Sequence, residues 1–191
     1  MRGFSKRCST VRLVESIAPT SEERAASMAG DDLISSPDAV MDRAFTLPAP
    51  PEVVWPWVLQ LGKRRAGWYL PSTVERFIPK GRRALRSVDP QWEELQIGDV
   101  IPDYGGRNET FEVARIEPPH RLVYRSQRGR MSVSWSISLE SMPATDETRM
   151  RLRLRLGPVR RRWLVATAGE LIDLLTVAGL AEGLRERVSV H

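Results

Sequence analysis

Two stretches in the second half of the chain alternate strictly between apolar and polar side chains. From residue 131 to 139 every second residue is apolar and the others are serines. From 149 to 156 apolar residues alternate with arginines. A period of two is the period of a β-strand with one buried face. With a polar turn at 141–147 between them, the two stretches predict an antiparallel hairpin with its serine and arginine face in solvent.

The sequence outside this hairpin predicts further strands and two helices, one after the first strand and one at the C-terminus. Weaker strand patterns occur at 41–47, 98–103, 110–117 and 121–127. A helix should begin at Pro50 and Pro51, where a missing N–H costs nothing, be kinked by Pro56 and end at Gly62. These elements predict an α+β fold built on an antiparallel sheet.

Residues 63–102 are irregular and too long for a plain connection. They have room for one short helix, from Ser72 to Ile78, in which Ser72 and Glu75 could form a capping box. Segments of this length in compact domains are typically lids or binding segments.

The stretch 160–187 predicts one long C-terminal helix. A projection at 100° per residue gives it an apolar face opposite Glu170 and Asp173, made of Leu164, Ala168, Leu171, Leu174, Leu175 and Ala178. Small residues follow one edge: Gly169, Thr176, Gly179 and Gly183. Such a strip predicts either a close approach by another segment or the edge of a cavity.

Residues 1–40 are rich in Ser, Ala and acids, a composition that cannot bury much apolar surface. We expect a flexible leader at 1–40 and one domain at 41–191. A chain that begins at Met41 should then melt within a few degrees of the full chain.

Charge and composition exclude several classes of protein. The 191 residues include 29 Lys and Arg and 24 Asp and Glu, for a net charge of +5, and 41% are hydrophobic, which excludes a disordered chain. One cysteine and two histidines exclude a disulfide framework and a Cys- or His-based metal site, and acids interrupt the longest apolar run. We expect a cytoplasmic protein with no cofactor.

Between Arg121 and Arg162 there are eleven arginines and three acids. The sheet face that carries these arginines is either a solvated outer surface or a site for anionic headgroups or nucleic-acid phosphates. Because no nucleic-acid motif is present, a nucleic-acid partner is not expected, and a weak contact with anionic membranes stays open.

Several stretches look like members of one superfamily: Ala49–Trp57, Arg65–Tyr69, Leu95–Asp99, Phe111–Val113 and Pro118–Tyr124. Together with the order of elements, they resemble the uncharacterised bacterial branch of the SRPBCC, or START-like, helix-grip superfamily. That resemblance spans about residues 41–187 and implies a curved sheet that grips the C-terminal helix around an apolar pocket. Because carriers, cyclases, hydrolase-like enzymes and sensors share this scaffold, it implies no single activity.

The pocket that the resemblance implies selects the candidate ligand-binding residues. Trp68 and Tyr69 lie in the irregular segment, where an aromatic pair is expected to close a pocket mouth. The other candidates are Tyr104, Tyr124, Trp135, Leu175, Thr176 and Gly179. The available acid–base groups, at Tyr69, Asp99, Tyr104, His120 and Tyr124, have no motif spacing, so we assign no catalytic residue.

Three hypotheses remain open at this point. The first is a non-enzymatic binder or carrier of an apolar small molecule, a lipid or a polyketide-like aromatic. The second is a cyclase- or dehydratase-like enzyme that acts on such a molecule. The third is a peripheral module that binds anionic surfaces through its arginine face. The sequence predicts no oligomeric state.

Overall fold

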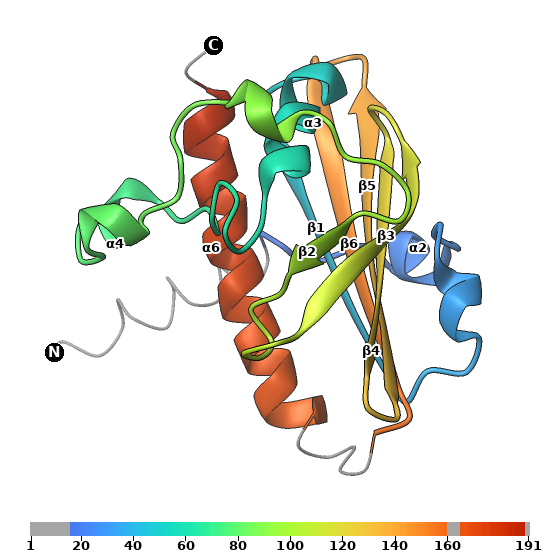
Figure 1. Cartoon of the computed structure of the whole chain (residues 1–191). Coiled ribbons are helices and arrows are strands. Elements are labelled where there is room, and N and C mark those ends of the chain that lie inside the picture. The colour runs from blue at the N-terminus through green and yellow to red at the C-terminus, as the bar shows by residue number, and fades with distance from the viewer. Residues whose placement is uncertain (1–15, 160–164, 190–191) are drawn as a thin grey trace, which may run out of the picture.

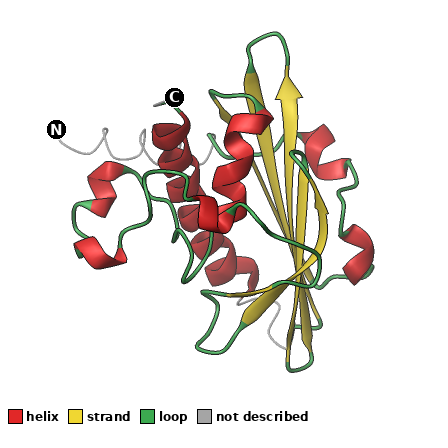
Figure 2. Cartoon of the chain, turned by 45° about the horizontal axis from the view of Figure 1, so that its top comes forward, coloured by secondary structure: helices red, strands yellow, loops and turns green. Residues whose placement is uncertain are grey.

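The computed structural model describes residues 16–159 and 165–189, and these form an antiparallel sheet with helices packed on its inner face (Figure 1). The sheet has six strands in the order β1-β6-β5-β4-β3-β2. Their bounds are β1 Ala39–Leu47, β2 Val100–Pro102, β3 Thr110–Glu117, β4 Arg121–Arg128, β5 Met131–Met142 and β6 Glu147–Gly157. The expected α+β class, with a curved sheet that grips a long C-terminal helix, is confirmed (Figure 2).

The central hairpin has the register that its sequence pattern predicts. Trp135 of β5 lies opposite Leu154 of β6, and Ile137 lies opposite Leu152. Apolar residues of both strands therefore share the inner face, which packs against α3 (Pro51–Gln60) and α6 (Glu170–Val188).

The helix α3 begins at Pro51 and carries Pro56 inside, as expected. The next helix, α4, covers only Ser72–Glu75, and its capping box is absent. Ser72 instead donates from its backbone N–H and hydroxyl to Glu186, and the Glu75 carboxylate forms a buried 2.7 Å ion pair with Arg187. The Glu75 carboxylate is drawn to α6 because Arg187 is buried there and needs a counterion.

The irregular segment is pinned to the C-terminal half of α6 and does not lie free as a lid. Besides α4 it holds two 3₁₀ turns, η2 (Lys80–Arg82) and η3 (Pro90–Trp92). Arg187 donates to the carbonyls of Leu70 and Leu85, and its guanidinium stacks over the Tyr69 ring. Among the described residues, no helix is long and apolar enough to cross a membrane.

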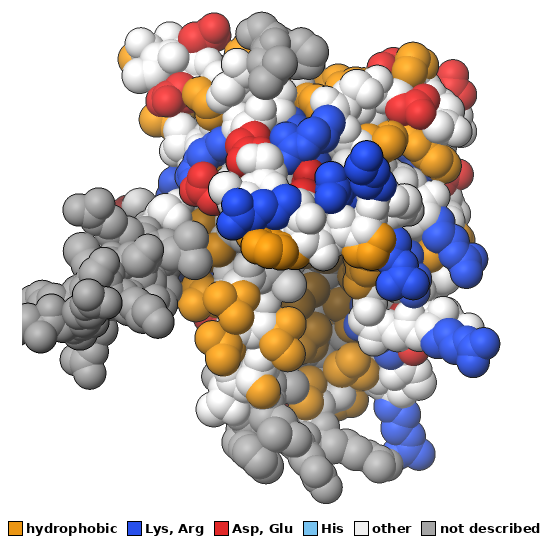
Figure 3. Space-filling model, turned by 90° about the vertical axis from the view of Figure 1, so that its left-hand side faces the viewer, with side chains coloured by type: hydrophobic (Ala, Val, Ile, Leu, Met, Phe, Trp, Pro, Cys, Tyr) orange, Lys and Arg blue, Asp and Glu red, His pale blue; other side chains and the backbone are white. Residues whose placement is uncertain are grey.

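The helix α6 follows a π-helical turn, η4 (Val165–Gly169), and its exposed face differs from the projected one. Leu171 and Leu175, expected to be buried, are 56% and 54% exposed, and Asp173, expected outside, forms an ion pair with the buried Arg43 of β1. Arg43 attracts this acid toward the sheet and so turns the leucines outward. Figure 3 shows hydrophobic side chains gathered on this side of the molecule. Residues 160–164, with Leu164, lie outside the described residues.

The flexible leader expected at 1–40 is wrong for its described part, because residues 16–38 pack on the outer face of the sheet (Figure 1). Ile17 is buried, and its carbonyl accepts a hydrogen bond from Ala44 of β1. The segment forms α2 (Ser21–Ala25), with a capping box between Thr20 and Glu23, and the 3₁₀ turn η1 (Asp31–Ile34). Residues 1–15 lie outside the described residues.

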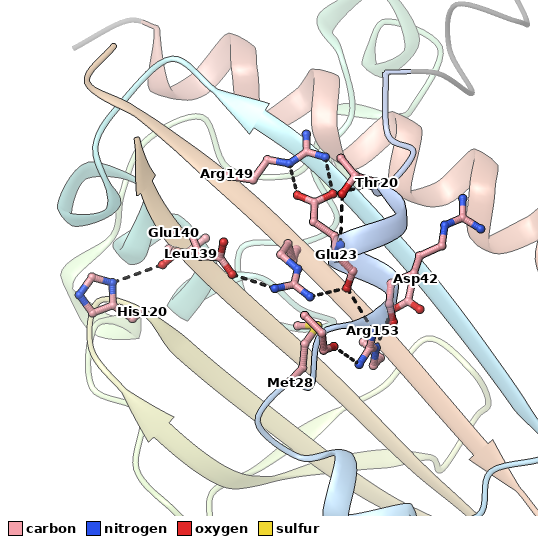
Figure 4. A network of polar contacts seen from close by, with 12 residues as sticks. Thr20, Glu23, Met28, Asp42, His120, Leu139, Glu140, Arg149 and Arg153 are labelled. Carbon is pink, nitrogen blue, oxygen red and sulfur yellow. Dashed lines mark hydrogen bonds and ion pairs between the residues drawn. The ribbon is translucent and has the colours of Figure 1, made fainter. Parts of the chain in front are cut away.

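The arginines of β6 hold this segment in place, so the expected solvated face is also wrong at its centre (Figure 4). Arg149 binds the Glu23 carboxylate through two nitrogens, at 2.7 and 2.8 Å. Arg153 contacts Asp31, Asp42 and the carbonyl of Arg24, and only 4% of it is exposed. Complementary charge, which composition alone does not reveal, fixes the segment to the sheet.

Candidate functional site

A cavity of about 220 Å³ lies between the sheet and the N-terminal half of α6. Most of its lining surface is apolar. It is lined by Trp68, Asp103, Gly105, Phe111, Arg128, Val133, Trp135, Leu154, Leu156, Asp173, Thr176 and Val177. Apolar residues of β3, β5 and β6 reach it because they follow the inward period of their strands.

Aromatic rings form one continuous wall of this cavity. Trp135 stacks on Tyr124 with ring centroids 5.7 Å apart and on Trp68 at 6.1 Å, and Phe111 lies 6.0 Å from Trp135. Such contacts fix the ring planes, so the wall presents flat faces in a defined orientation.

Trp68 joins the irregular segment to α6. Its indole Nε1 donates a 3.1 Å hydrogen bond to the carbonyl of Thr176. The turn before it is closed by a bridge between Gly62 and Gly67, where both glycines have positive φ values of 145° and 91°. Glycine permits these backbone angles without strain, and the turn directs Trp68 toward the helix.

One polar cluster lies at the helix side of the cavity. Arg43 of β1 approaches Asp173 at 2.9 Å and Glu170 at 2.6 Å. Burial raises the pKa of Asp173 to about 6, and Glu170 adds to the rise while Arg43 opposes it. This carboxyl is therefore poised to change its charge near neutral pH.

A second cluster lies at the turn between β2 and β3. Arg128 binds the carboxylate of Asp103 and lies 3.7 Å from that of Glu109, with its guanidinium over the Phe111 ring. A side chain at Gly105 would collide with Arg128, since an added Cβ would lie 2.5 Å from its Nη1. The absence of a side chain at position 105 lets the guanidinium reach the cavity.

Of the eight ligand-binding candidates, the structure brings three to the cavity: Trp68, Trp135 and Thr176. Tyr104 contacts Trp68 edge-on at 6.1 Å but is 54% exposed. Tyr124 is buried behind Trp135 as a support of the wall.

The other three candidates lie elsewhere. Tyr69 belongs to the core, where its hydroxyl donates to the carbonyl of Trp57, and Leu175 is exposed. Gly179 faces Leu70, whose Cδ2 would lie 2.7 Å from an added Cβ. At Gly179 and Gly183 the small-residue strip therefore marks a close approach by residues 69–70, and the cavity begins one turn earlier, at Thr176.

The acid–base candidates do not converge on a site. Asp99 and His120 are exposed turn residues; the backbone N–H of Gln96 donates to Asp99, and the His120 ring contacts the carbonyl of Leu139. Burial raises the pKa of Tyr69 and of Tyr124 well above the usual tyrosine value. Within the described ranges, no group of three His, Cys, Asp or Glu side chains could hold a metal ion.

Sequence reasoning missed the charged residues of the cavity, Asp103, Arg128 and Asp173. A signal existed only for Asp173, an acid in an apolar helix with an arginine in the expected first strand. Asp103 and Arg128 are 25 residues apart and meet only because β3 and β4 fold back on each other.

Two larger hollows, of about 500 and 420 Å³, lie on the outer face on either side of η1. The lining of the 420 Å³ hollow is mainly polar, and that of the 500 Å³ hollow is about equally polar and apolar. Several of the charges there already pair with each other: Arg115 with Asp32, Arg125 with Glu112, Arg121 with Glu117, and Arg151 with Glu140. The smaller cavity on the inner face is the one whose surface suits an apolar molecule.

Neither a family model nor a curated protein matches this chain. Among solved structures, CalU16 from Micromonospora echinospora is 19% identical, with 79% of this chain and 84% of that chain covered and a TM-score of 0.42. DynU16, a protein in the dynemicin biosynthetic locus, is 21% identical over 76% of this chain and 46% of its own, with a TM-score of 0.47. A protein from Arthrobacter aurescens is 14% identical over 93% of both chains, with a TM-score of 0.48. No ligand, activity or family membership follows from similarities of this size.

Proposed function

We propose that this protein binds a small apolar molecule in the cavity between the sheet and α6. The observation that carries the proposal is an apolar hollow with an aromatic wall, in Trp68, Phe111 and Trp135, next to the buried core. Pockets for small molecules are typically concave and apolar with a few polar groups, and this cavity has that composition.

The packing of α6 supports this proposal. Its C-terminal half is in close contact, since an added Cβ at Gly183 would lie 2.6 Å from backbone atoms of Tyr69 and Leu70. Its N-terminal half lines the cavity with Asp173, Thr176 and Val177. A helix that is tight at one end and open at the other leaves room for a guest without disturbing the fold.

A matched pair of substitutions tests the proposal. Leu154→Phe adds ring atoms to the cavity lining, whereas Leu175→Phe makes the same change at an exposed site on α6. With 2-methylnaphthalene as the probe in isothermal titration calorimetry, we expect binding to the wild type and to Leu175→Phe, and at least tenfold weaker binding to Leu154→Phe.

The Leu175→Phe variant is the control for a general effect of an added ring. If neither the wild type nor this control binds the probe, or if Leu154→Phe binds as well as they do, the cavity is not the binding site. Circular dichroism verifies that both variants are folded.

A second candidate function is catalysis on the bound molecule, and Asp173 favours it. A carboxyl whose pKa lies at about 6 in an apolar cavity is suited to general acid–base chemistry. Mass spectrometry of a bound molecule before and after incubation with the wild type and with Asp173→Asn distinguishes an enzyme from a carrier. A product with a changed mass, or with a changed chromatographic retention because ring closure alone conserves mass, that forms only with the wild type would support catalysis. No change in either property with both proteins would contradict it.

The third hypothesis, binding of anionic surfaces through the arginine face, gains less support. Arg149, Arg153 and Arg155 already face carboxylates of Glu23, Asp31 and Asp42. Anionic headgroups would have to displace residues 16–38 before they could reach these guanidinium groups.

A further inference from the structure

The volume of the cavity limits the size of its occupant. A dry apolar cavity of about 150 Å³ accepts benzene. At about 220 Å³, this cavity has room for one or two rings, and because it is open to solvent, the rest of a larger molecule would extend out of it. This step and those below rest on the proposed function.

The charges around the cavity disfavour an anionic occupant. Each of the two polar clusters combines one guanidinium with two carboxylates: Arg43 with Glu170 and Asp173, and Arg128 with Asp103 and Glu109. Lys63 is also close to the second cluster, where its ammonium donates to the carbonyls of Asp103 and Gly106. Among the described residues, both arginines at the cavity are thus already neutralised, and neither is left to pair with a carboxylate or phosphate of a ligand.

One acceptor at the cavity is incompletely used. The Oδ2 atom of Asp173 is buried 2.9 Å from Arg43 Nε as an ion pair, and neither atom has a hydrogen-bond partner among the described residues. The same carboxyl lines the cavity, and no described residue donates a hydrogen bond to its other oxygen. A buried carboxylate oxygen gains free energy from a well-aligned donor, and hydrogen bonds to charged groups are the strong ones. The site therefore lacks a donor at this position.

We propose that the occupant is an uncharged aromatic molecule of one or two rings that carries a hydroxyl or similar donor, and that Asp173 accepts its hydrogen bond. The flat faces of Trp68 and Trp135 contact the rings, and Asp173 fixes their orientation. A donor-bearing ring satisfies the apolar wall and the free acceptor together, which neither a hydrocarbon nor an aromatic acid does.

Three probes with the same ring system test this inference: 2-naphthol, 2-methylnaphthalene and 2-naphthoate. The hydroxyl and the methyl group have nearly the same size, so the first two differ mainly in the donor. By calorimetry at pH 7.5 with the wild type, we expect 2-naphthol to bind about 10–100-fold more tightly than 2-methylnaphthalene and 2-naphthoate to bind most weakly.

Two variants assign the preference to one residue. Asp173→Leu removes the acceptor while it keeps the branched shape of the side chain, and it should abolish the difference between 2-naphthol and 2-methylnaphthalene. Glu170→Gln alters the other acid that pairs with Arg43, outside the cavity lining, and should preserve the difference.

The outcomes separate this inference from the proposed function. Equal binding of 2-naphthol and 2-methylnaphthalene to the wild type, or tightest binding of 2-naphthoate, overturns the inference and leaves apolar binding intact. Binding of none of the three overturns both. The comparison of probes on the wild type holds even if Asp173→Leu fails to fold.

Discussion

The groups around Asp173 determine the pKa of its carboxyl. It lines an apolar cavity, and one guanidinium, that of Arg43, is shared between it and Glu170. Across the cavity, Asp103 and Arg128 neutralise each other and offer it little further stabilisation. Desolvation is then the largest influence on Asp173 and raises its pKa to about 6.

This pKa predicts how the stability of the protein depends on pH. Between about pH 4 and 6, the folded protein holds the Asp173 proton while the unfolded chain releases it, so the contribution of Asp173 to stability falls as pH rises. Asp173→Asn lacks this titration. At each pH, the free energy of unfolding of the wild type, measured with urea, is subtracted from that of the variant. This difference should increase by up to about 3 kcal/mol from pH 4 to pH 7.

The comparison with the wild type at each pH removes the contributions of all other groups. If Asp173→Asn instead loses stability relative to the wild type as pH rises, attraction to Arg43 exceeds desolvation and the pKa of Asp173 is lowered.

At the scale of elements, the strands could be predicted from the sequence because the alternation of apolar and polar residues lies within each strand itself. The alternation in β5 and β6 reflects only whether a residue faces inward, and the observed register follows it. The face of α6 could not be predicted in this way. Its apolar residues exceed what one face can bury, and the choice among them depends on Arg43, on a strand more than a hundred residues away.

Residues of the cavity lining could be predicted only where the residue type alone indicates that a side chain borders a cavity. Trp68 and Trp135 line the cavity, as expected for large aromatic residues in a loop and on an inner sheet face. Gly179 was placed there wrongly, since a small residue permits both a cavity and a close contact. Only the position of Leu70 decides between these alternatives.

The close contact predicts different outcomes for two glycines of α6. At Gly183 an added Cβ would lie 2.6 Å from backbone atoms of Tyr69 and Leu70, which cannot yield easily. At Gly179 it would meet only the Cδ2 end of the Leu70 side chain. In urea denaturation we expect Gly183→Ala to lose about 1–3 kcal/mol, and Gly179→Ala to stay within about 1 kcal/mol of the wild type.

The two variants control each other, because both replace a helical glycine by alanine and gain the same helix propensity. Equal stability of the two would contradict the close approach by residues 69–70. It would also restore the strip of small residues as a candidate cavity edge.

At the scale of the whole molecule, the chain forms three layers: the helices α3 and α6, the sheet, and residues 16–38 on the outer face (Figures 1 and 4). Arg149 lowers the pKa of Glu23, and although burial opposes the shift, a backbone hydrogen bond and Arg155 lower that of Asp31. These carboxylates therefore stabilise the fold above their unfolded pKa values and lose that contribution as pH falls. Local composition could not predict this layer, because the arginines that pair with Glu23 and Asp31 lie more than a hundred residues later in the sequence.

The third layer depends on a close approach at Gly30, which gives the last prediction. Gly30 has a φ of 92°, and an added Cβ would lie 2.6 Å from Val123 Cγ1 and 2.8 Å from Ser136 Oγ. Gly129 also has a positive φ, of 61°, but faces open space, so Gly129→Ala measures the backbone strain alone, roughly 1–2 kcal/mol. Gly30→Ala should lose about 1–3 kcal/mol more from overpacking, with faster tryptic cleavage after Arg24 as residues 16–38 detach. Equal losses in the two variants, with unchanged cleavage, would mean that these residues do not stabilise the sheet, and a chain beginning at Met41 would then keep the melting temperature of the full one.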